Sequence, residues 1–135
     1  EHCFDTTKPY EGILETLSEL KMRGKRMAIV SNKMQEATEQ LRRRFFADYI
    51  DVAIGESERI RKKPAPDAVI EALRLLECDD RDRALYIGDS DVDIDTARAS
   101  GLRCVSVLWG FRDRGFLTNH GADCLIDSPS ELLAL

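Results

Sequence analysis

The sequence contains no long hydrophobic run and no excess of positive charge. No apolar stretch approaches the roughly 20 residues that a membrane-spanning helix requires, so we expect no membrane segment. Its 20 lysines and arginines are outnumbered by 25 acidic residues, which leaves a net charge of -5. This balance argues against a nucleic-acid groove, because such grooves are basic. We therefore expect a soluble protein that binds neither nucleic acid nor membrane.

Cysteine is scarce and scattered. The four cysteines form no Cys-x-x-Cys pair, which argues against a zinc site or a redox dithiol. Cys104 and Cys124 lie in apolar segments, where we expect buried thiols, although a single bridged pair stays open. This usage favours a reducing cytoplasm as the location. The length of 135 residues suits one domain with a core of its own.

What the sequence does contain is a regular alternation of short apolar runs and helical patterns. The runs predict buried strands, and apolar residues spaced three and four apart predict helices between them. Strands are expected at 27–30, 49–54, 84–87, 103–108 and 124–126, and helices at 13–23, from about 34, from 66 to about 78, at 91–100, at 116–119 and from 129 onwards. The alternation predicts an α/β fold with a parallel sheet and right-handed crossovers.

Two aspartates follow the buried strand at 84–87. Asp89 comes directly after Gly88 at the strand end, and Asp93 lies one helical turn later on the same face. Two adjacent carboxylates repel each other unless a cation lies between them or one is protonated. Their hard oxygen atoms suit Mg2+. The carboxyl edge of a parallel sheet is also where α/β proteins bind ligands, so this turn is a candidate site.

Two further polar segments are expected at the same edge of the sheet. Ser31 and Asn32 end the strand at 27–30, and Lys63 precedes the helix that begins near Pro66. A hydroxyl, an ammonium group and a carboxylate pair are the groups that phosphoryl transfer requires. Each has an ordinary alternative when taken singly: a loop or helix cap for the Ser-Asn pair, a surface lysine, and helix N-terminal acids that the helix dipole favours.

The order of these elements resembles a known family. A strand ending in Ser, then Lys-Pro-x-Pro-Asp at 63–67, then Gly-Asp-Ser-x-x-Asp at 88–93 is similar to the second, third and fourth motifs of the haloacid dehalogenase superfamily. The likeness is strongest to its phosphoglycolate phosphatase-like members. Shorter matches occur at 2–3, 9–13, 109–112 and 121–123, so the resemblance covers essentially the whole chain. It implies a three-layer Rossmann-like core.

The resemblance also implies roles for individual residues. Ser31 and the backbone of Asn32 would bind the transferring phosphoryl group, and Lys63 would neutralise charge on that group and on the nucleophile. Asp89 would be a ligand of Mg2+, and Asp93 would orient Lys63 or a metal-bound water. The implied substrate is a small phosphorylated metabolite, hydrolysed as a phosphomonoester by way of an aspartyl-phosphate.

One part of the family pattern is absent. The first motif in that family, Asp-x-Asp-x-Thr at the end of an opening strand, supplies the nucleophile and the general acid/base, and no such motif occurs here. Asp5 stands in Phe-Asp-Thr-Thr without a preceding apolar strand or a second aspartate, and we expect it to be linker. The family's cap domain, which chooses the substrate, is also missing.

We therefore expect residues 1–12 to be a segment that returns from an absent cap, and residues 13–135 to be a partial core without its central nucleophile strand. That strand would lie between those ending at Ser31 and at Asp89, and its loss would leave two sheet edges unpaired, which proteins avoid. A missing N-terminal segment of the same protein or a swapped dimer would fill the gap. The chain alone is expected to be inactive, and a continuous five-stranded sheet would refute this interpretation.

Other folds and functions fit less well. The spaced aspartates from Asp89 onward resemble a calcium loop, but Ile94 and Ser100 stand where an EF-hand requires glycine and glutamate. A receiver domain would present its acids, hydroxyl and lysine in another order, and a dinucleotide-binding domain would have a Gly-rich turn after its first strand. One alternative stays open, a catalytically inactive module that binds a phosphate ligand, Mg2+ or a partner.

Overall fold

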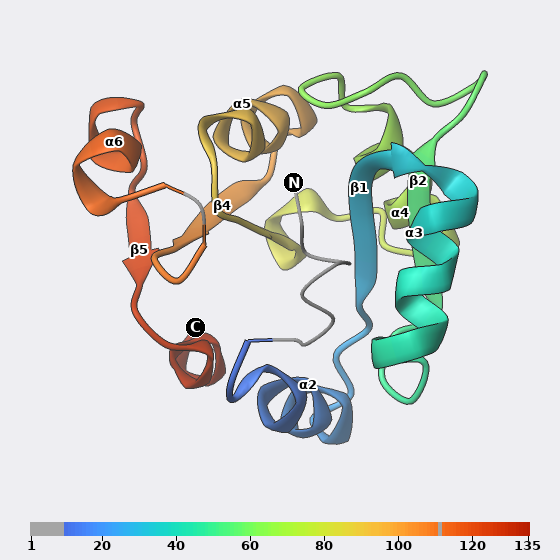
Figure 1. The fold of residues 1–135 in the computed structure, drawn as a ribbon, viewed down its shortest axis with the longest axis horizontal. Helices are drawn as coiled ribbons and strands as arrows, with labels where there is room; N and C mark the ends of the chain where they lie inside the picture. The colour runs from blue at the N-terminus through green and yellow to red at the C-terminus, as the bar shows by residue number, and fades with distance from the viewer. Residues whose placement is uncertain (1–9, 111) are drawn as a thin grey trace.

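Strands and helices alternate along the chain as the sequence predicts. The computed structural model describes residues 10–110 and 112–135. Its elements are α2 (Ile13–Met22), β1 (Ala28–Met34), α3 (Gln35–Leu41), η1 (Arg42–Phe46), β2 (Val52–Glu56), α4 (Asp67–Leu75), η2 (Arg81–Arg83), β3 (Leu85–Gly88), α5 (Asp91–Ser100), β4 (Arg103–Val107), α6 (Arg114–Asn119), β5 (Cys124–Ile126) and η3 (Pro129–Ala134). Figure 1 shows strands lying between α5 on one side and α2 on the other, which confirms the predicted α/β class.

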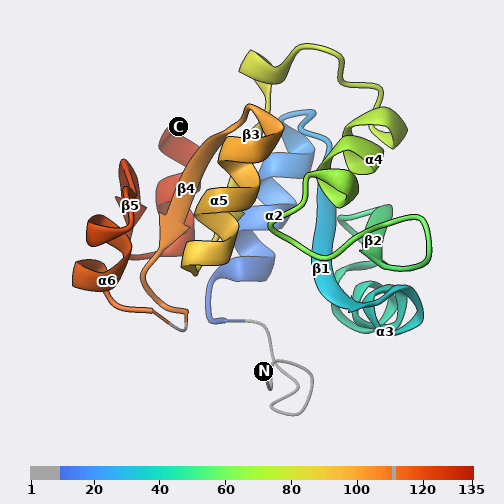
Figure 2. The same ribbon diagram turned by 90° about the horizontal axis from the view of Figure 1, so that it is seen from above.

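The strands form two separate parallel sheets. β1 pairs with β2, and β3, β4 and β5 pair in that order. Within the described residues no ladder joins β1 to β3, and Figure 2 shows the two groups of strands apart from each other. The break lies where the sequence predicts a missing strand. A single five-stranded sheet would have refuted that prediction, and the interrupted sheet of the described residues agrees with it.

On one face the two sheets share a core. Val69 and Leu73 of α4, Tyr86 of β3 and Ala97 of α5 are buried together, and Val30 of β1 packs against them. α4 contacts both β1 and β2, and α5 contacts both β3 and β4. The two helices therefore connect the sheets on this side, where the described strands do not pair.

The opposite face of β3 is less covered. Leu85 is 39% exposed and Ile87 is 46% exposed, whereas Tyr86 between them is buried. The apolar run at 84–87 predicts a buried strand. That prediction is wrong for β3, because the described residues bury only the face that α4 and α5 cover.

The helix ends are set by local sequence. Gly24 follows α2 at a φ of 82°, and Gly101 follows α5 at 74°, both in the left-handed region that glycine tolerates best. Near the end of the chain, Ser128 and Glu131 form a capping box, with Pro129 at the start of the helix. The six-residue segment that follows is a 3-10 helix rather than an α-helix.

Some predicted details differ from the structure. β1 extends to Met34, and β2 begins at Val52 rather than at residue 49, because the chain before it turns back onto Phe46 through two backbone hydrogen bonds. Cys104 and Cys124 are half-buried rather than buried, and both are free thiols. The prediction for residues 1–12 falls largely on residues 1–9, which lie outside the described part of the chain.

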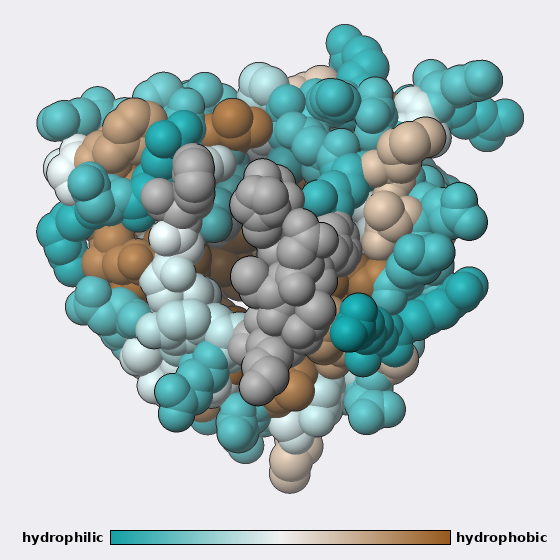
Figure 3. All heavy atoms as spheres, viewed as in Figure 1, coloured by the Kyte–Doolittle hydropathy of each residue, from teal (hydrophilic) through white to brown (hydrophobic). Residues whose placement is uncertain are grey.

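Polar side chains dominate the surface. Figure 3 shows mostly hydrophilic residues around the rim of this face, with smaller hydrophobic areas between them. This distribution agrees with a sequence in which 33% of the residues are charged. None of the helices in the described ranges is long and apolar enough to cross a membrane.

Candidate active site

Asp93 is the centre of the candidate site. It lies in the first turn of α5, and its side chain is 8% exposed. Its Oδ1 accepts hydrogen bonds from Lys63 Nζ at 2.8 Å and from the Tyr86 hydroxyl at 2.7 Å. Its Oδ2 accepts from the backbone N–H of Asp89 at 3.0 Å and from the Ser90 hydroxyl at 3.2 Å. Each carboxylate oxygen therefore has two donors.

The protonation states in this cluster follow from its contacts. Burial by itself raises the pKa of Asp93, but the Lys63 ammonium and the hydrogen bonds from Lys63 and Tyr86 outweigh burial and lower that pKa below its usual value. Burial and the adjacent Asp93 carboxylate raise the pKa of Tyr86. At neutral pH Asp93 is therefore ionised, while Tyr86 keeps its proton and acts as a donor.

The backbone of Lys63 is held by Asn32. The Lys63 N–H donates to Asn32 Oδ1 at 2.6 Å, and Asn32 Nδ2 donates to the Lys63 carbonyl at 3.4 Å. The resemblance implies a phosphate contact only for the backbone of Asn32. Its side chain has a separate task, because it joins the end of the first sheet to the lysine that pairs with Asp93.

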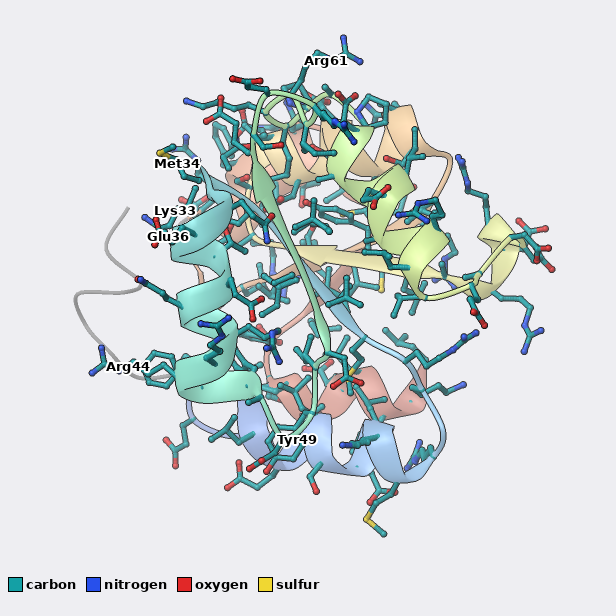
Figure 4. All side chains as sticks on the ribbon, turned by 90° about the vertical axis from the view of Figure 1, so that its right-hand side faces the viewer. Lys33, Met34, Glu36, Arg44, Tyr49 and Arg61 are labelled. Atoms are coloured by element: carbon teal, nitrogen blue, oxygen red, sulfur yellow. The ribbon has the colours of Figure 1, made fainter. Side chains whose placement is uncertain are left out.

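The predicted phosphate-binding segment is an irregular part of β1. Regular pairing with β2 stops at Val30 and resumes at Met34, so the residues between them oppose Gly55 alone. Ser31 Oγ accepts the N–H of Lys33 at 3.0 Å, and its hydroxyl proton can still be donated to another acceptor. Irregular strand segments of this kind are frequent beside active sites. Figure 4 shows Lys33 and Met34 on the outside of the molecule, where β1 leads into α3.

Asp89, the predicted metal ligand, packs against a glycine. It directly follows β3 and is half-buried. A Cβ atom at Gly110 would lie 2.3 Å from the Asp89 Cβ, and a Cβ atom at Gly88 would lie 2.3 Å from the Asp93 Cβ. Both separations are far inside van der Waals contact. Glycine at these two positions therefore allows the two acidic side chains to approach the neighbouring backbone.

Asp89 is the candidate carboxylate for a divalent cation. Asp93 is engaged by four donors, and Asp89 at the strand end is the residue that the family resemblance assigns to the metal. Residues 10–110 and 112–135 bring no three metal-ligating side chains together. Mg2+ needs only one or two protein carboxylates, because waters and substrate phosphate complete its shell. Asp89 therefore fits as one ligand of a set that these residues leave incomplete.

The predicted site residues converge. Contacts run from Asn32 to Lys63, from Lys63 to Asp93 and from Asp93 to Asp89. Ser31 is the chain neighbour of Asn32. Residues from three separate segments of the chain are thus joined at the ends of β1 and β3.

Three further residues of the site escaped the sequence analysis. Ser90 caps α5 by accepting the N–H of Asp93, and a serine just before a helical pattern is a usable signal for such a cap. Tyr86 gives a weaker signal, which is that buried tyrosine hydroxyls usually find a partner. Gly110 lies in the segment at 109–112 that matches the family, but that match does not indicate its contact with Asp89, because the two residues are distant in sequence. Asp5 lies outside the described residues, so its assignment as linker stays a prediction.

An ion pair closes the loop that carries Lys63. The Arg61 guanidinium donates to both carboxylate oxygens of Asp67 at 2.8 and 2.9 Å, and the Arg61 N–H donates to the same group at 3.0 Å. Figure 4 shows Arg61 at the outer edge of this loop. Asp67 begins α4, so the pair joins the loop to the helix behind it.

We expect the Asp67 carboxyl to titrate well below an ordinary aspartate. Side-chain hydrogen bonds from Arg61, and after them its backbone hydrogen bond, lower the pKa of Asp67 to about 2. Because the folded value lies below the unfolded value of about 3.9, the pair stabilises the fold above that pH, and the stabilisation is lost as the pH falls toward about 2. A 13C NMR titration of the carboxyl carbon measures the midpoint.

The matched variants for this titration are Arg61→Gln and Arg59→Gln. Arg61→Gln removes the guanidinium and should raise the Asp67 midpoint toward its ordinary value. Arg59 is exposed in the same loop and has no contact with Asp67 among the described hydrogen bonds, so Arg59→Gln should leave the midpoint in place. An unchanged midpoint in Arg61→Gln would contradict the assignment.

Comparison with known proteins agrees with the motif order and the geometry of the site. The sequence profile of the haloacid dehalogenase-like hydrolases matches residues 1–107. The chain belongs to the haloacid dehalogenase-like hydrolase family. This membership confirms the resemblance predicted from the motifs at 63–67 and 88–93.

Relatives of this haloacid dehalogenase-like chain are longer than it is. It is 33% identical over 130 residues to a phosphoglycolate phosphatase of Aquifex aeolicus, and 29% identical over 136 residues to the pyrophosphatase PpaX of Bacillus anthracis. These matches cover 96% and 100% of the chain but only 59% and 62% of the two relatives.

A solved structure is likewise similar to this chain and longer than it. A crystal structure from Lactobacillus delbrueckii subsp. bulgaricus, provisionally assigned as a phosphoglycolate phosphatase, is 43% identical in sequence and superposes with a TM-score of 0.89. The match covers 92% of this chain and 52% of that one. The haloacid dehalogenase-like core predicted from the sequence is therefore confirmed, and the chain spans about half to three-fifths of these related proteins.

Proposed function

We propose that the whole protein hydrolyses small phosphomonoesters with the help of Mg2+, as an enzyme of the phosphoglycolate phosphatase type. The observation that carries this proposal is the run of contacts from Asn32 through Lys63 and Asp93 to Asp89. These contacts bring three parts of the chain together at the strand ends: the segment that carries the Ser31 hydroxyl, the Lys63 ammonium group and the Asp93 carboxylate. The names of the relatives, phosphoglycolate phosphatase and pyrophosphatase, support a phosphate-containing substrate.

Each residue of the site has a task in this proposal. Ser31 donates its hydroxyl proton to a phosphoryl oxygen, and the Lys63 ammonium neutralises negative charge as the phosphoryl group is transferred. Asp93 holds the Lys63 ammonium in place through their ion pair. Asp89 would hold Mg2+, which when bound offsets the charge on the phosphate oxygens.

The nucleophile would come from outside the described residues. In an aspartyl-phosphate route, a carboxylate oxygen attacks phosphorus, the phosphoester bond breaks, and the leaving oxygen takes a proton from a general acid. Water then attacks the phosphorus of the aspartyl-phosphate and releases inorganic phosphate. Since the sequence has no Asp-x-Asp-x-Thr, we infer that another segment of the whole protein supplies the nucleophile and the acid.

The break between the two sheets is where such a segment fits. Within the described chain the facing edges of β1 and β3 have no strand partner, and one parallel strand between them would bond to both. It would lie beside Leu85 and Ile87, whose partial exposure marks an open region of the fold. A swapped copy of this chain is the alternative occupant. Sedimentation of the 135-residue chain distinguishes the two, because only the swapped arrangement needs a dimer.

The test of the function compares the 135-residue chain with the whole protein. Both are assayed for phosphate release from phosphoglycolate, pyrophosphate and sugar phosphates, with and without Mg2+. We expect turnover by the whole protein, lost when EDTA removes the metal, and none by the chain alone. Turnover by the chain alone would show that no outside nucleophile is needed. A whole protein that hydrolyses none of these compounds would overturn the proposal.

The absence of the first motif favours a second function. The chain would then be a catalytically inactive module that binds a phosphate ligand, Mg2+ or a partner. On this alternative, the natural gene product has an intact mass close to the 15.3 kDa of this chain and binds without turnover. For either function we propose a cytoplasmic location, because the cysteines in the described ranges are free thiols.

A further inference from the structure

Tyr86 lies between the core and the site. Its ring is buried with Val69 and Leu73 of α4 and Ala97 of α5, and the residue is 5% exposed. Its hydroxyl lies 2.7 Å from Asp93 Oδ1. Because packing fixes the ring, the hydroxyl is held in one position relative to α5.

The carboxylate of Asp93 depends on its donors for its orientation. The terminal torsion of an aspartate is broad, so the side chain by itself does not fix where the oxygens point. The Asp89 N–H and the Ser90 hydroxyl fix Oδ2, and Lys63 and Tyr86 fix Oδ1. Lysine is a long and flexible donor. Tyr86 is therefore the rigid donor on the oxygen that Lys63 binds.

Tyr86 also lies beside Lys63 directly. Lys63 Nζ is 5.9 Å from the centroid of the Tyr86 ring, within the range of a cation–π contact. The same ammonium is 2.8 Å from Asp93 Oδ1. The ring therefore limits where the ammonium can move, and the hydroxyl holds the oxygen that the ammonium contacts.

We propose that Tyr86 is a positioning residue, whose hydroxyl holds Asp93 Oδ1 and through it the Lys63 ammonium in place for phosphoryl transfer. This inference rests on the function proposed above. Tyr86 does not touch the reacting atoms, so its effect passes through Lys63. Phenylalanine keeps the packing of the ring and its contact with the ammonium but removes the hydroxyl. The substitution Tyr86→Phe therefore separates positioning from packing.

The test uses the whole protein with Tyr86→Phe, and with Tyr49→Phe as the matched control. Tyr49 lies near α2, at the opposite end of Figure 4 from Arg61 and the loop of Lys63. We expect Tyr86→Phe to lower kcat about tenfold with KM unchanged, since a misplaced ammonium weakens only the transition state. The 1H–15N signal of the Lys63 ammonium, assigned by its loss in Lys63→Arg, should be sharp in the unchanged protein and broaden in Tyr86→Phe. Tyr49→Phe should change neither quantity.

Together, kcat and the Lys63 ammonium signal distinguish a failure of this inference from a failure of the proposed function. An unchanged kcat together with an unchanged Lys63 signal in Tyr86→Phe would overturn the inference. If the unchanged protein has no phosphatase activity, the proposed function fails, and the Lys63 signal alone decides whether Tyr86 positions the ammonium. Thermal unfolding of both variants shows that the comparison is made between folded proteins. Equal broadening in Tyr49→Phe would mean that the effect is not specific to the hydroxyl on Asp93, which would also overturn the inference.

Discussion

Lys63→Ala is expected to lower the kcat of the whole protein by about a thousandfold. The Lys63 side chain is only 14% exposed and its ammonium is aligned by Asp93. An electrostatic group that is aligned before the reaction typically contributes about 10²–10³ in rate. Alanine removes that charge, and water cannot replace it with a fixed orientation. Steady-state phosphate release at saturating substrate measures the loss.

The control for this variant is the neighbouring lysine. Lys62 is exposed, so Lys62→Ala changes the net charge equally but should leave kcat within about twofold. Lys63→Arg keeps a positive charge but replaces a compact ammonium by a planar group, and we expect it to recover only part of the activity. A Lys63→Ala enzyme as active as Lys62→Ala would remove Lys63 from the mechanism.

The same variant should also be less stable. Asp93 is 8% exposed and would keep its charge without its cation, and breaking a buried ion pair in this way costs about 3–5 kcal/mol. Urea unfolding of the whole protein measures the change in the free energy of unfolding. Adding Asp93→Asn to Lys63→Ala should recover part of the loss, because it removes the unpaired charge.

Asp89→Asn is expected to abolish Mg2+-dependent turnover, with a loss of about a thousandfold or more. A metal ion at a phosphoryl group is worth several kcal/mol, and each 1.4 kcal/mol is about tenfold in rate. Asparagine has nearly the same size, so it keeps the packing against Gly110 and the backbone N–H that binds Asp93. It removes the negative charge and replaces one acceptor oxygen by an NH2 donor. Calorimetric titration with Mg2+ should show weaker binding in parallel with the lost activity.

Asp95, further along in α5, provides the control for Asp89→Asn. Asp95 pairs with His120 at 3.0 Å and with Arg98 at 3.5 Å, away from the strand end. Asp95→Asn should therefore leave Mg2+ binding and turnover unchanged. If Asp89→Asn bound Mg2+ as tightly as Asp95→Asn, the metal assignment would be wrong even if activity fell.

The sequence predicts the elements of this protein well where the cause is local. Alternating apolar runs and helical spacing indicate the strands and helices, because burial of one face imposes a period on each element. Gly101 ends a helix through its backbone geometry, and the box from Ser128 to Glu131 begins one through side-chain hydrogen bonds to the neighbouring backbone. The ordered motifs around Ser31 and Lys63 then indicate the family and the candidate site.

Other features depend on contacts between distant segments. Asn32 and Lys63 are 31 positions apart, and Lys63 and Asp93 are 30 positions apart. Neither contact leaves a trace in the periodicity of the sequence. The same holds for Tyr86, which the pattern describes only as a buried strand residue. The partial exposure of Leu85 and Ile87 contradicts that pattern, because the described residues cover only the opposite face of β3.

The sequence by itself therefore determined the order of the elements, the residue types of the site and the absence of the first motif. The tertiary structure decided that the sheet is interrupted between β1 and β3 and that Asp93 is bound by four donors. It also decided that the missing side chain at Gly110 leaves room for the side chain of Asp89. The physical reason is that periodicity and caps arise from the backbone within a few residues. Contacts across the site arise instead from how α4 and α5 pack on two sheets, and that packing depends on the whole chain at once.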